Sequence, residues 1–265
     1  MNNYKRKKYP FRLGTTSYIL PDDILPNVLY LTPLVDDIEL VLFESPDFSN
    51  IPSVSQVEQF RDYAVQNECG YTVHLPIDRK AGSDNPVERK RFCETAINIV
   101  ERTSMLEPRA WVLHCEGING DASPEEIIHW QERCLDTIKL LTEKVGDSSR
   151  LVIENLSYPA EWNFDIVKKG KCRYCLDVGH LWLRGDNNWE EICAKMLPNT
   201  SVVHLHGVRD GKDHISLHKR NEDVLSRFVK LLASMHYHGV VTLEIFSQND
   251  LFESLCLFET LWERH

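Results

Sequence analysis

The sequence lacks any long hydrophobic run. None of its apolar stretches approaches the ~20 residues that a transmembrane helix needs. The basic N-terminus continues into Tyr9-Pro10-Phe11-Arg12, where a secretory signal would have an apolar stretch and a small-residue cleavage site. These absences argue against a membrane protein and against a secreted one. We therefore expect a cytoplasmic protein with no membrane partner.

Cysteine is too sparse for a disulfide scaffold, with eight residues in a chain of 265. Most of them fall in apolar, helix-like patterns, where Cys acts as a small hydrophobe: Cys69, Cys93, Cys134, Cys193 and Cys256. Cys172 and Cys175 have the spacing of a redox motif, but they lie at a predicted strand and not at a helix N-terminus. The sequence therefore indicates reduced thiols.

Positive charge is also scarce, since 30 Lys and Arg face 40 Asp and Glu, which gives a net charge of −10. The average field of such a protein repels a polyanion, so nucleic acid is a disfavoured partner. The only dense basic run, Lys5–Lys8, falls within residues 1–10, which we interpret as a basic N-terminal tail. The length and the 42% hydrophobic content suit one domain over residues 1–265.

Short β-rich runs alternate with amphipathic segments along the chain. The expected strands are Arg12–Ser17, Ile38–Glu44, Tyr71–Leu75, Ala110–Cys115, Arg150–Leu156, Arg173–Val178, Ser201–Gly207 and Val240–Phe246. The expected helices are Asp22–Val35, Val54–Asn67, Pro86–Met105, Pro124–Lys144, Phe164–Lys168, Trp189–Met196, Asp223–His236 and Asn249–Glu263. Such repeats imply right-handed crossovers and a parallel sheet that can close on itself. The predicted fold class is therefore α/β, a single (β/α)₈ barrel.

An open, doubly wound sheet is the alternative fold. It would need a glycine-rich phosphate-binding turn or a clear switch point. The first expected strand instead reads Leu13-Gly14-Thr15-Thr16-Ser17, and no G-x-G-x-x-G follows it.

Six consecutive expected strands end in His, Glu or Asp. These residues are His74, His114, Glu154, Asp177 with His180, His204 with His206, and Glu244. The C-terminal ends of the strands of a parallel barrel meet at one mouth. So many carboxylates and imidazoles would be costly there unless a cation neutralised them. Mixed His and carboxylate donors suit zinc, manganese or iron better than magnesium, so we predict a divalent metal site.

A polar loop follows the seventh expected strand. It carries Asp213 and His214, which are well placed to complete a second or third metal position. Arg209, Lys212 and Arg220 lie nearby and could hold an anionic group by charge-assisted hydrogen bonds. Aromatic residues that could contact a ligand across the barrel mouth are Tyr18, Tyr158, Trp162, Trp182 and Phe246.

From strand three onward the pattern resembles the AP endonuclease family 2 branch of the xylose isomerase-like barrels. The resemblance implies two or three divalent ions, with zinc the first choice. It implies these metal ligands: His74, His114, Glu154, Asp177, His180, His206 or His204, Asp213, His214 and Glu244. It also implies that Glu154 bridges two ions and acts in catalysis together with Asp177 and Glu244.

The N-terminal half is similar to one subgroup, the cobamide-remodelling phosphodiesterases. The similarity lies in Gly14-Thr15-Thr16-Ser17-Tyr18-Ile19, Asn27-Val28 and the stretch from Val35 to Glu44, and later in His204-Leu205-His206-Gly207 and Lys212-Asp213-His214. It implies hydrolysis of a phosphoester in the nucleotide loop of a cobamide. The substrate would then be a small molecule, a corrinoid.

Three other functions remain open. A sugar isomerase or epimerase on the same barrel would rely on one metal held by Glu154, Asp177, His206 and Glu244, and it would not need the remaining imidazoles. An AP endonuclease would have to bind DNA against the negative net charge. A barrel that only sequesters a corrinoid would not need so many potential metal ligands.

Overall fold

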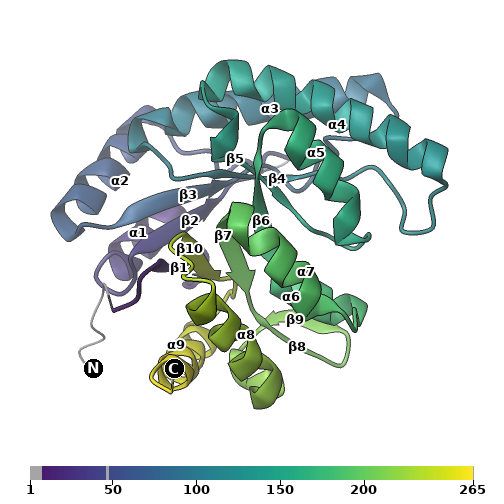
Figure 1. Ribbon diagram of the computed structural model, residues 1–265. Coiled ribbons are helices and arrows are strands. Elements are labelled where there is room, and N and C mark those ends of the chain that lie inside the picture. Colours follow the sequence, from purple (N-terminus) through teal and green to yellow (C-terminus); the bar gives the residue numbers. More distant parts are fainter. Residues whose placement is uncertain (1–7, 46–47, 265) are drawn as a thin grey trace.

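The eight β-rich runs form a closed barrel of parallel strands in the computed structural model, which describes residues 8–45 and 48–264 (Figure 1). Around the barrel the order is β1-β10-β7-β6-β5-β4-β3-β2. Their bounds are β1 Arg12–Thr16, β2 Asp37–Val41, β3 Gly70–His74, β4 Trp111–His114, β5 Leu151–Glu154, β6 Arg173–Asp177, β7 Thr200–Leu205 and β10 Val240–Leu243. This closed order confirms the (β/α)₈ prediction and excludes the open sheet.

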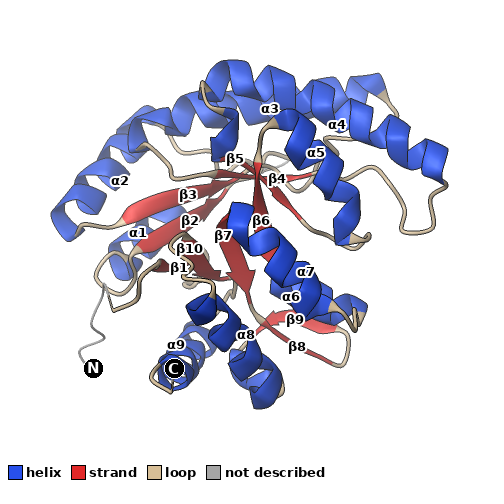
Figure 2. Cartoon of the chain, in the orientation of Figure 1, coloured by secondary structure: helices blue, strands red, loops and turns tan. Residues whose placement is uncertain are grey.

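Helices surround the barrel on its outside (Figure 2). Their bounds are α1 Ile24–Leu31, α2 Val54–Asn67, α3 Pro86–Thr103, α4 Pro124–Val145, α5 Asn163–Gly170, α6 Val178–Arg184, α7 Trp189–Met196, α8 Glu222–Ser234 and α9 Gln248–Trp262. Ser53 and Ser123 each cap a helix in a reciprocal capping box, which fixes where α2 and α4 begin. Among the described helices, none combines the length and apolar character that a membrane crossing requires.

Side chains alternate along each strand, so residues two apart share one face. One buried apolar cluster consists of Ala110, Val112, Val152, Cys175, Val202 and Val240. Two residues after four of its members come His114, Glu154, Asp177 and His204. The strand register sets His114 beside Glu154, and Asp177 beside His204. The polar residues therefore stand directly above an apolar layer of the barrel interior.

Two elements near the barrel mouth differ from the sequence prediction. Helix α6 begins directly after Asp177, in a stretch that was expected to end a strand. The expected loop after the seventh strand is an antiparallel hairpin of β8, Gly207–Arg209, and β9, Lys212–Ile215. Asp210 and Gly211 turn it with φ of 53° and 75°, the left-handed backbone that an Asp-Gly hairpin turn favours.

The start of the described chain is attached to the last helix. Lys8 Nζ lies 2.7 Å from a carboxylate oxygen of Glu263, and Tyr9 packs edge-on against Phe258 at 5.5 Å between ring centroids. The rest of the basic run, Lys5, Arg6 and Lys7, lies outside the described residues.

All eight cysteines are free, and only Cys256 is exposed. Cys172 and Cys175 are both buried and are not joined by a disulfide. Reduced thiols stay a prediction, with which the burial of seven of the eight cysteines is consistent.

Candidate metal centre

Glu154 ends β5 and lies among imidazoles from neighbouring strands. Its Oε2 is 3.3 Å from Nε2 of His74 and 3.0 Å from Nε2 of His114, and its side chain is only 1% exposed. His74 Nδ1 lies 2.8 Å from the carbonyl oxygen of Leu75, to which it can only donate. A neutral His74 therefore turns its Nε2 lone pair toward a carboxylate, an arrangement that a cation would stabilise. His74, His114 and Glu154 form the first group that could hold a metal ion.

A second group joins Glu154 to Asp177, His204 and Glu244, with one donor atom from each lying within 4.8 Å of the others. His204 Nδ1 approaches Glu244 Oε2 to 3.1 Å and Glu154 Oε2 to 3.5 Å. Both atoms of the 3.1 Å contact, His204 Nδ1 and Glu244 Oε2, are buried, and neither makes a hydrogen bond of acceptable geometry within the described residues. Leaving such atoms unpaired is costly, so the donor set fits a bound cation.

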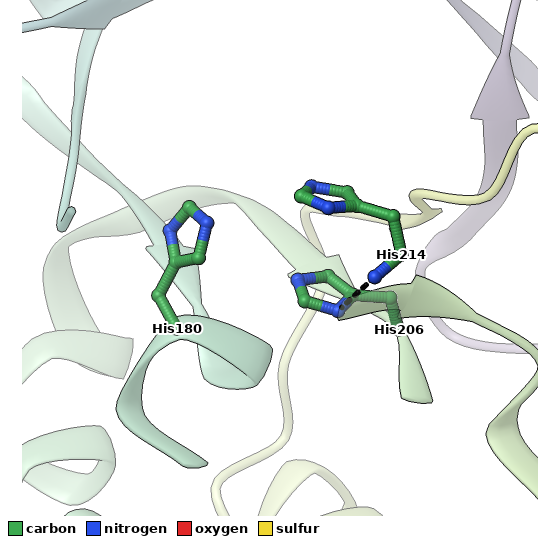
Figure 3. A group of neighbouring side chains, drawn as sticks. All are labelled: His180, His206 and His214. Atoms are coloured by element: carbon green, nitrogen blue, oxygen red, sulfur yellow. Dashed lines mark hydrogen bonds between the residues drawn. The ribbon is translucent and has the colours of Figure 1, made fainter. Parts of the chain in front are cut away.

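The third group consists of His180, His206 and His214, whose side chains meet in Figure 3. Asp177 caps α6 by accepting a hydrogen bond from the His180 amide at 2.6 Å, and this places His180 above the end of β6. The hairpin returns His214 over His206, so that their rings stack with centroids 4.3 Å apart. Three imidazoles from different elements thus converge beside the second group.

His204 and His206 have different surroundings. His206 Nδ1 accepts a hydrogen bond from the His214 amide at 3.0 Å, as Figure 3 shows. A neutral His206 therefore carries its proton on Nε2, which lies 3.3 Å from Asp177 Oδ2 and can donate to it. His204 instead belongs to the carboxylate group. The single-metal alternative named His206 for that position, and the structure places His204 there.

Gly179 makes the position of His206 possible. A Cβ atom at residue 179 would lie 2.1 Å from Cε1 of the His206 ring, so a larger residue would displace the imidazole. Within the four residues Asp-Val-Gly-His, Asp177 caps α6, Gly179 leaves room for the His206 ring, and His180 supplies an imidazole.

Glu39 of β2 is fully buried and was not among the residues predicted from the sequence. Its Oε2 accepts a hydrogen bond from His204 Nε2 at 2.9 Å. With its proton held at Nε2, His204 presents the Nδ1 lone pair to the second group, as in carboxylate–histidine–metal arrangements. The signal in the sequence that could have identified Glu39 is an acidic residue inside a β-rich run, two positions after Asp37. Glu39 and Cys175 also appear in two further donor groups that overlap these three.

Opposite charges stabilise the ionised forms of these side chains. Burial alone would lower the pKa of His114, but Glu154 and Glu116 raise it to about 10. Burial would raise the pKa of Glu154, but His114 and His204 hold it well below its usual range. Burial likewise opposes the charge of His214, but Glu244 raises its pKa to about 9. At neutral pH without metal, His114 and His214 therefore carry protons on ring nitrogens that a metal ion would need.

Asp213 lies outside the three groups. Its Oδ1 is 3.2 Å from His214 Nδ1, so it is placed to orient that ring, and it also lines the neighbouring hollow. The nine other predicted metal ligands all fall in one of the three groups: His74, His114, Glu154, Asp177, His180, His204, His206, His214 and Glu244.

The residues predicted to bind substrate do not converge. Trp182 is only 5% exposed, and the guanidinium of Arg220 lies 4.9 Å above its ring, so both take part in packing. Arg209 and Lys212 are exposed on the hairpin. The Tyr18 hydroxyl accepts a hydrogen bond from Asn50 at 2.7 Å. None of these five lines the hollow beside the metal groups.

That hollow has a volume of about 1160 Å³ and opens beside the first and third groups, whose members His114 and His180 line it. His114, His180 and Asp213 form part of its wall. The charged side chains of the wall are the cationic Lys80, Arg133 and Arg184 and the acidic Asp84, Glu88, Glu116, Asp121 and Glu126. Tyr158, one of the aromatic residues considered for ligand contact, also lines it, although only 2% of its surface is exposed. A ligand in this hollow would therefore reach the metal groups from one side.

Comparisons with known proteins agree with this architecture. A family model described as xylose isomerase-like TIM barrel matches residues 35–260. A D-tagatose 3-epimerase-like protein is similar at a TM-score of 0.76 and 20% identity, covering 96% of this chain and 98% of that one. A D-psicose 3-epimerase with D-tagatose from Clostridium cellulolyticum gives 0.72 and 15%, covering 95% and 98%. A Thermus thermophilus protein soaked with ZnCl₂ gives 0.66 and 17%, covering 97% and 99%. No curated protein matches the sequence.

Replacing Glu39 with Gln should weaken metal binding by about 10–100-fold, because it removes the charge that orients His204 and raises its basicity. The dissociation constant is measured by chelator competition on protein whose circular dichroism matches wild type. Asp37→Asn is the matched control, since Asp37 is a buried carboxylate of the same strand that accepts from Thr72 and not from His204. Equal loss of affinity in both variants would contradict a specific role for Glu39.

Metal binding should release protons and strengthen as the pH rises from 7 to 9. The raised pKa values mean that His114 and His214 hold protons there, and each proton displaced should make affinity rise about tenfold per pH unit. Calorimetry in buffers of different ionisation enthalpy counts the protons. His114→Gln should release fewer, whereas His129→Gln, which changes an exposed imidazole, should match wild type. A pH-independent affinity over this range would be inconsistent with protonated rings.

Proposed function

The chain belongs to the xylose isomerase-like TIM barrels, and from this premise we propose that it is a metal-dependent phosphodiesterase. The observation that carries the proposal is the set of three donor groups around Glu154 and Asp177. A single cation would be satisfied by the second group alone. Imidazoles at His74, His114 and His180 have no use in a one-metal site, and they suit a site for two or three ions.

The donor types favour zinc, with manganese or iron as alternatives, because imidazole and carboxylate are mixed. Divalent cations, when bound, polarise phosphoryl oxygens and lower the pKa of water. Glu154 belongs to both the first and the second group, so it would help to hold a cation in either. Asp177 and Glu244 complete the second group, and His206 would hold Asp177 in place by donating to it. In that arrangement a cation in the third group would be held by His180 and His214.

The size of the hollow supports a substrate larger than a monosaccharide. Its volume of about 1160 Å³ exceeds the ~300–1,000 Å³ of usual small-molecule sites. The resemblance of the N-terminal half to cobamide-remodelling phosphodiesterases favours a phosphoester in the nucleotide loop of a cobamide.

A sugar epimerase or isomerase is the second candidate, and the comparisons support it better than the first. The similar solved structures are mainly epimerases and isomerases of this barrel. Glu154, Asp177, His204 and Glu244 would suffice to hold its one cation. At 20% identity or less these structures establish the fold alone, and the additional imidazoles lead us to place hydrolysis first.

The two candidates are separated by incubating the metal-loaded protein with a complete cobamide and, in parallel, with D-tagatose. We expect chromatography to show release of the lower-ligand nucleoside and no change in the sugar. Glu154→Gln should reduce the rate by at least about 10³-fold, because it removes the carboxylate shared by two groups. Glu190→Gln, a surface change on α7, should retain the wild-type rate.

An intact cobamide after long incubation, with metal occupancy confirmed, would contradict the phosphodiesterase proposal. Conversion of D-tagatose would support the epimerase in its place. An oligonucleotide containing an abasic site completes the panel, and efficient nicking of it would favour a nuclease against the charge argument.

A further inference from the structure

A second hollow lies at the opposite end of the barrel, where the strands begin. It has a volume of about 420 Å³ and is lined by the start of β6, β7 and β10 and by the turns before β4 and β10. Its polar lining consists of Arg109, Arg173, Thr200, Ser201, His236 and His238, with the Tyr237 ring beside them. No Asp or Glu occurs among the described residues that line it. In a chain with a net charge of −10, this hollow therefore has two arginines and no carboxylate in its described lining.

Arg173 is the first residue of β6 and shares the face of Cys175 and Asp177, which points into the barrel. Its Nε is buried and has no hydrogen-bond partner within residues 8–45 and 48–264. A buried donor on a permanently charged group is expensive to leave unsatisfied. The Nε–H group of Arg173 therefore lacks a hydrogen-bond acceptor, which a ligand in the hollow could provide.

Arg109 is compensated only in part. Its Nε lies 3.6 Å from Oδ2 of Asp37, and the other oxygen of that carboxylate accepts from Thr72 at 2.9 Å. The guanidinium of Arg12 also lies beside Gly70. A Cβ atom built at residue 70 would be 3.2 Å from Arg109 Nε and 3.5 Å from Arg12 Nη2, so both guanidinium groups lie near that residue. Burial and the charge of Arg12 lower the pKa of Arg109. One carboxylate thus faces two guanidinium groups.

The rim of the hollow adds His236 and His238, both exposed. His238 Nδ1 lies 3.1 Å from the carbonyl oxygen of Pro10, to which it can only donate. The ring is thereby held at the rim by the segment that leads into β1. Ser201 supplies a hydroxyl on the same wall.

We propose that this hollow binds the phosphate group of a small molecule between Arg109 and Arg173. Planar guanidinium groups match phosphate oxygens in paired hydrogen bonds, and a dianion would balance the excess charge. The hollow is larger than a free phosphate needs, so the ligand is a phosphorylated molecule and not the inorganic ion alone. The site shares no lining residue with the hollow at the metal groups.

Calorimetry and thermal melting of the metal-loaded protein with ribose 5-phosphate and with inorganic phosphate test this site. We expect one ribose 5-phosphate per chain, bound more tightly than inorganic phosphate and accompanied by a rise in Tm. Arg173→Gln should weaken this binding at least tenfold. Without ligand the same variant should melt no lower than wild type, because it loses an unpaired, partly buried charge.

Arg227→Gln is the matched control, because Arg227 is an exposed arginine paired with Glu190. It should bind ribose 5-phosphate as wild type does. Wild-type affinity in Arg173→Gln would overturn the site by placing any binding elsewhere, for example at the metal centre. Binding of inorganic phosphate alone, or of neither probe, would also overturn the proposal.

Discussion

The burial of Glu154 among imidazoles is the interaction on which the barrel mouth depends. Its carboxylate is 1% exposed and lies within 3.5 Å of rings from β3, β4 and β7. A charge so far from water needs compensation from every side. Protons on His114 and His204 supply that compensation in the metal-free protein, and divalent cations would supply it in the loaded one. The raised pKa values of these two rings and the unpaired donor atoms are two consequences of this single constraint.

Further hydrogen bonds position the side chains around the Glu154 carboxylate. Glu39 holds His204, while His206 donates to Asp177 and is itself held by the His214 amide. Each of these contacts fixes which nitrogen of a ring carries a proton. The donor atoms that remain are aimed at one another, which is unfavourable without a cation and favourable with one. The outer contacts therefore determine the metal-binding geometry as much as the donors do.

Much of this arrangement could be predicted from the sequence, because the C-terminal ends of parallel strands must meet. His74, His114, Glu154 and Asp177 follow from that rule once the strands are located. Glu39 does not, since its role depends on which residue of β7 faces it across the barrel. The different roles of His204 and His206 could not be predicted either. They depend on the hydrogen bonds that the two rings make with Glu39, Asp177 and the His214 amide. The predicted substrate residues Arg220 and Trp182 failed to reach the hollow because they pack on each other.

The two ends of the barrel differ in charge as well as in chemistry. The metal groups gather carboxylates at one end, while two arginines line the second hollow at the other. The cytoplasmic location and the lack of a nucleic-acid partner remain proposals that rest on composition. The fold itself is shared with epimerases, so the distinction in function depends on the number of ions at the mouth.

The number of metal ions per chain tests that distinction most directly. Elemental analysis of protein purified without a tag, combined with native mass spectrometry, gives this number. We expect two or three divalent ions, with zinc foremost, and the loss of at least one in His74→Gln. A single ion that survives that substitution would contradict the multinuclear centre and would support a one-metal epimerase.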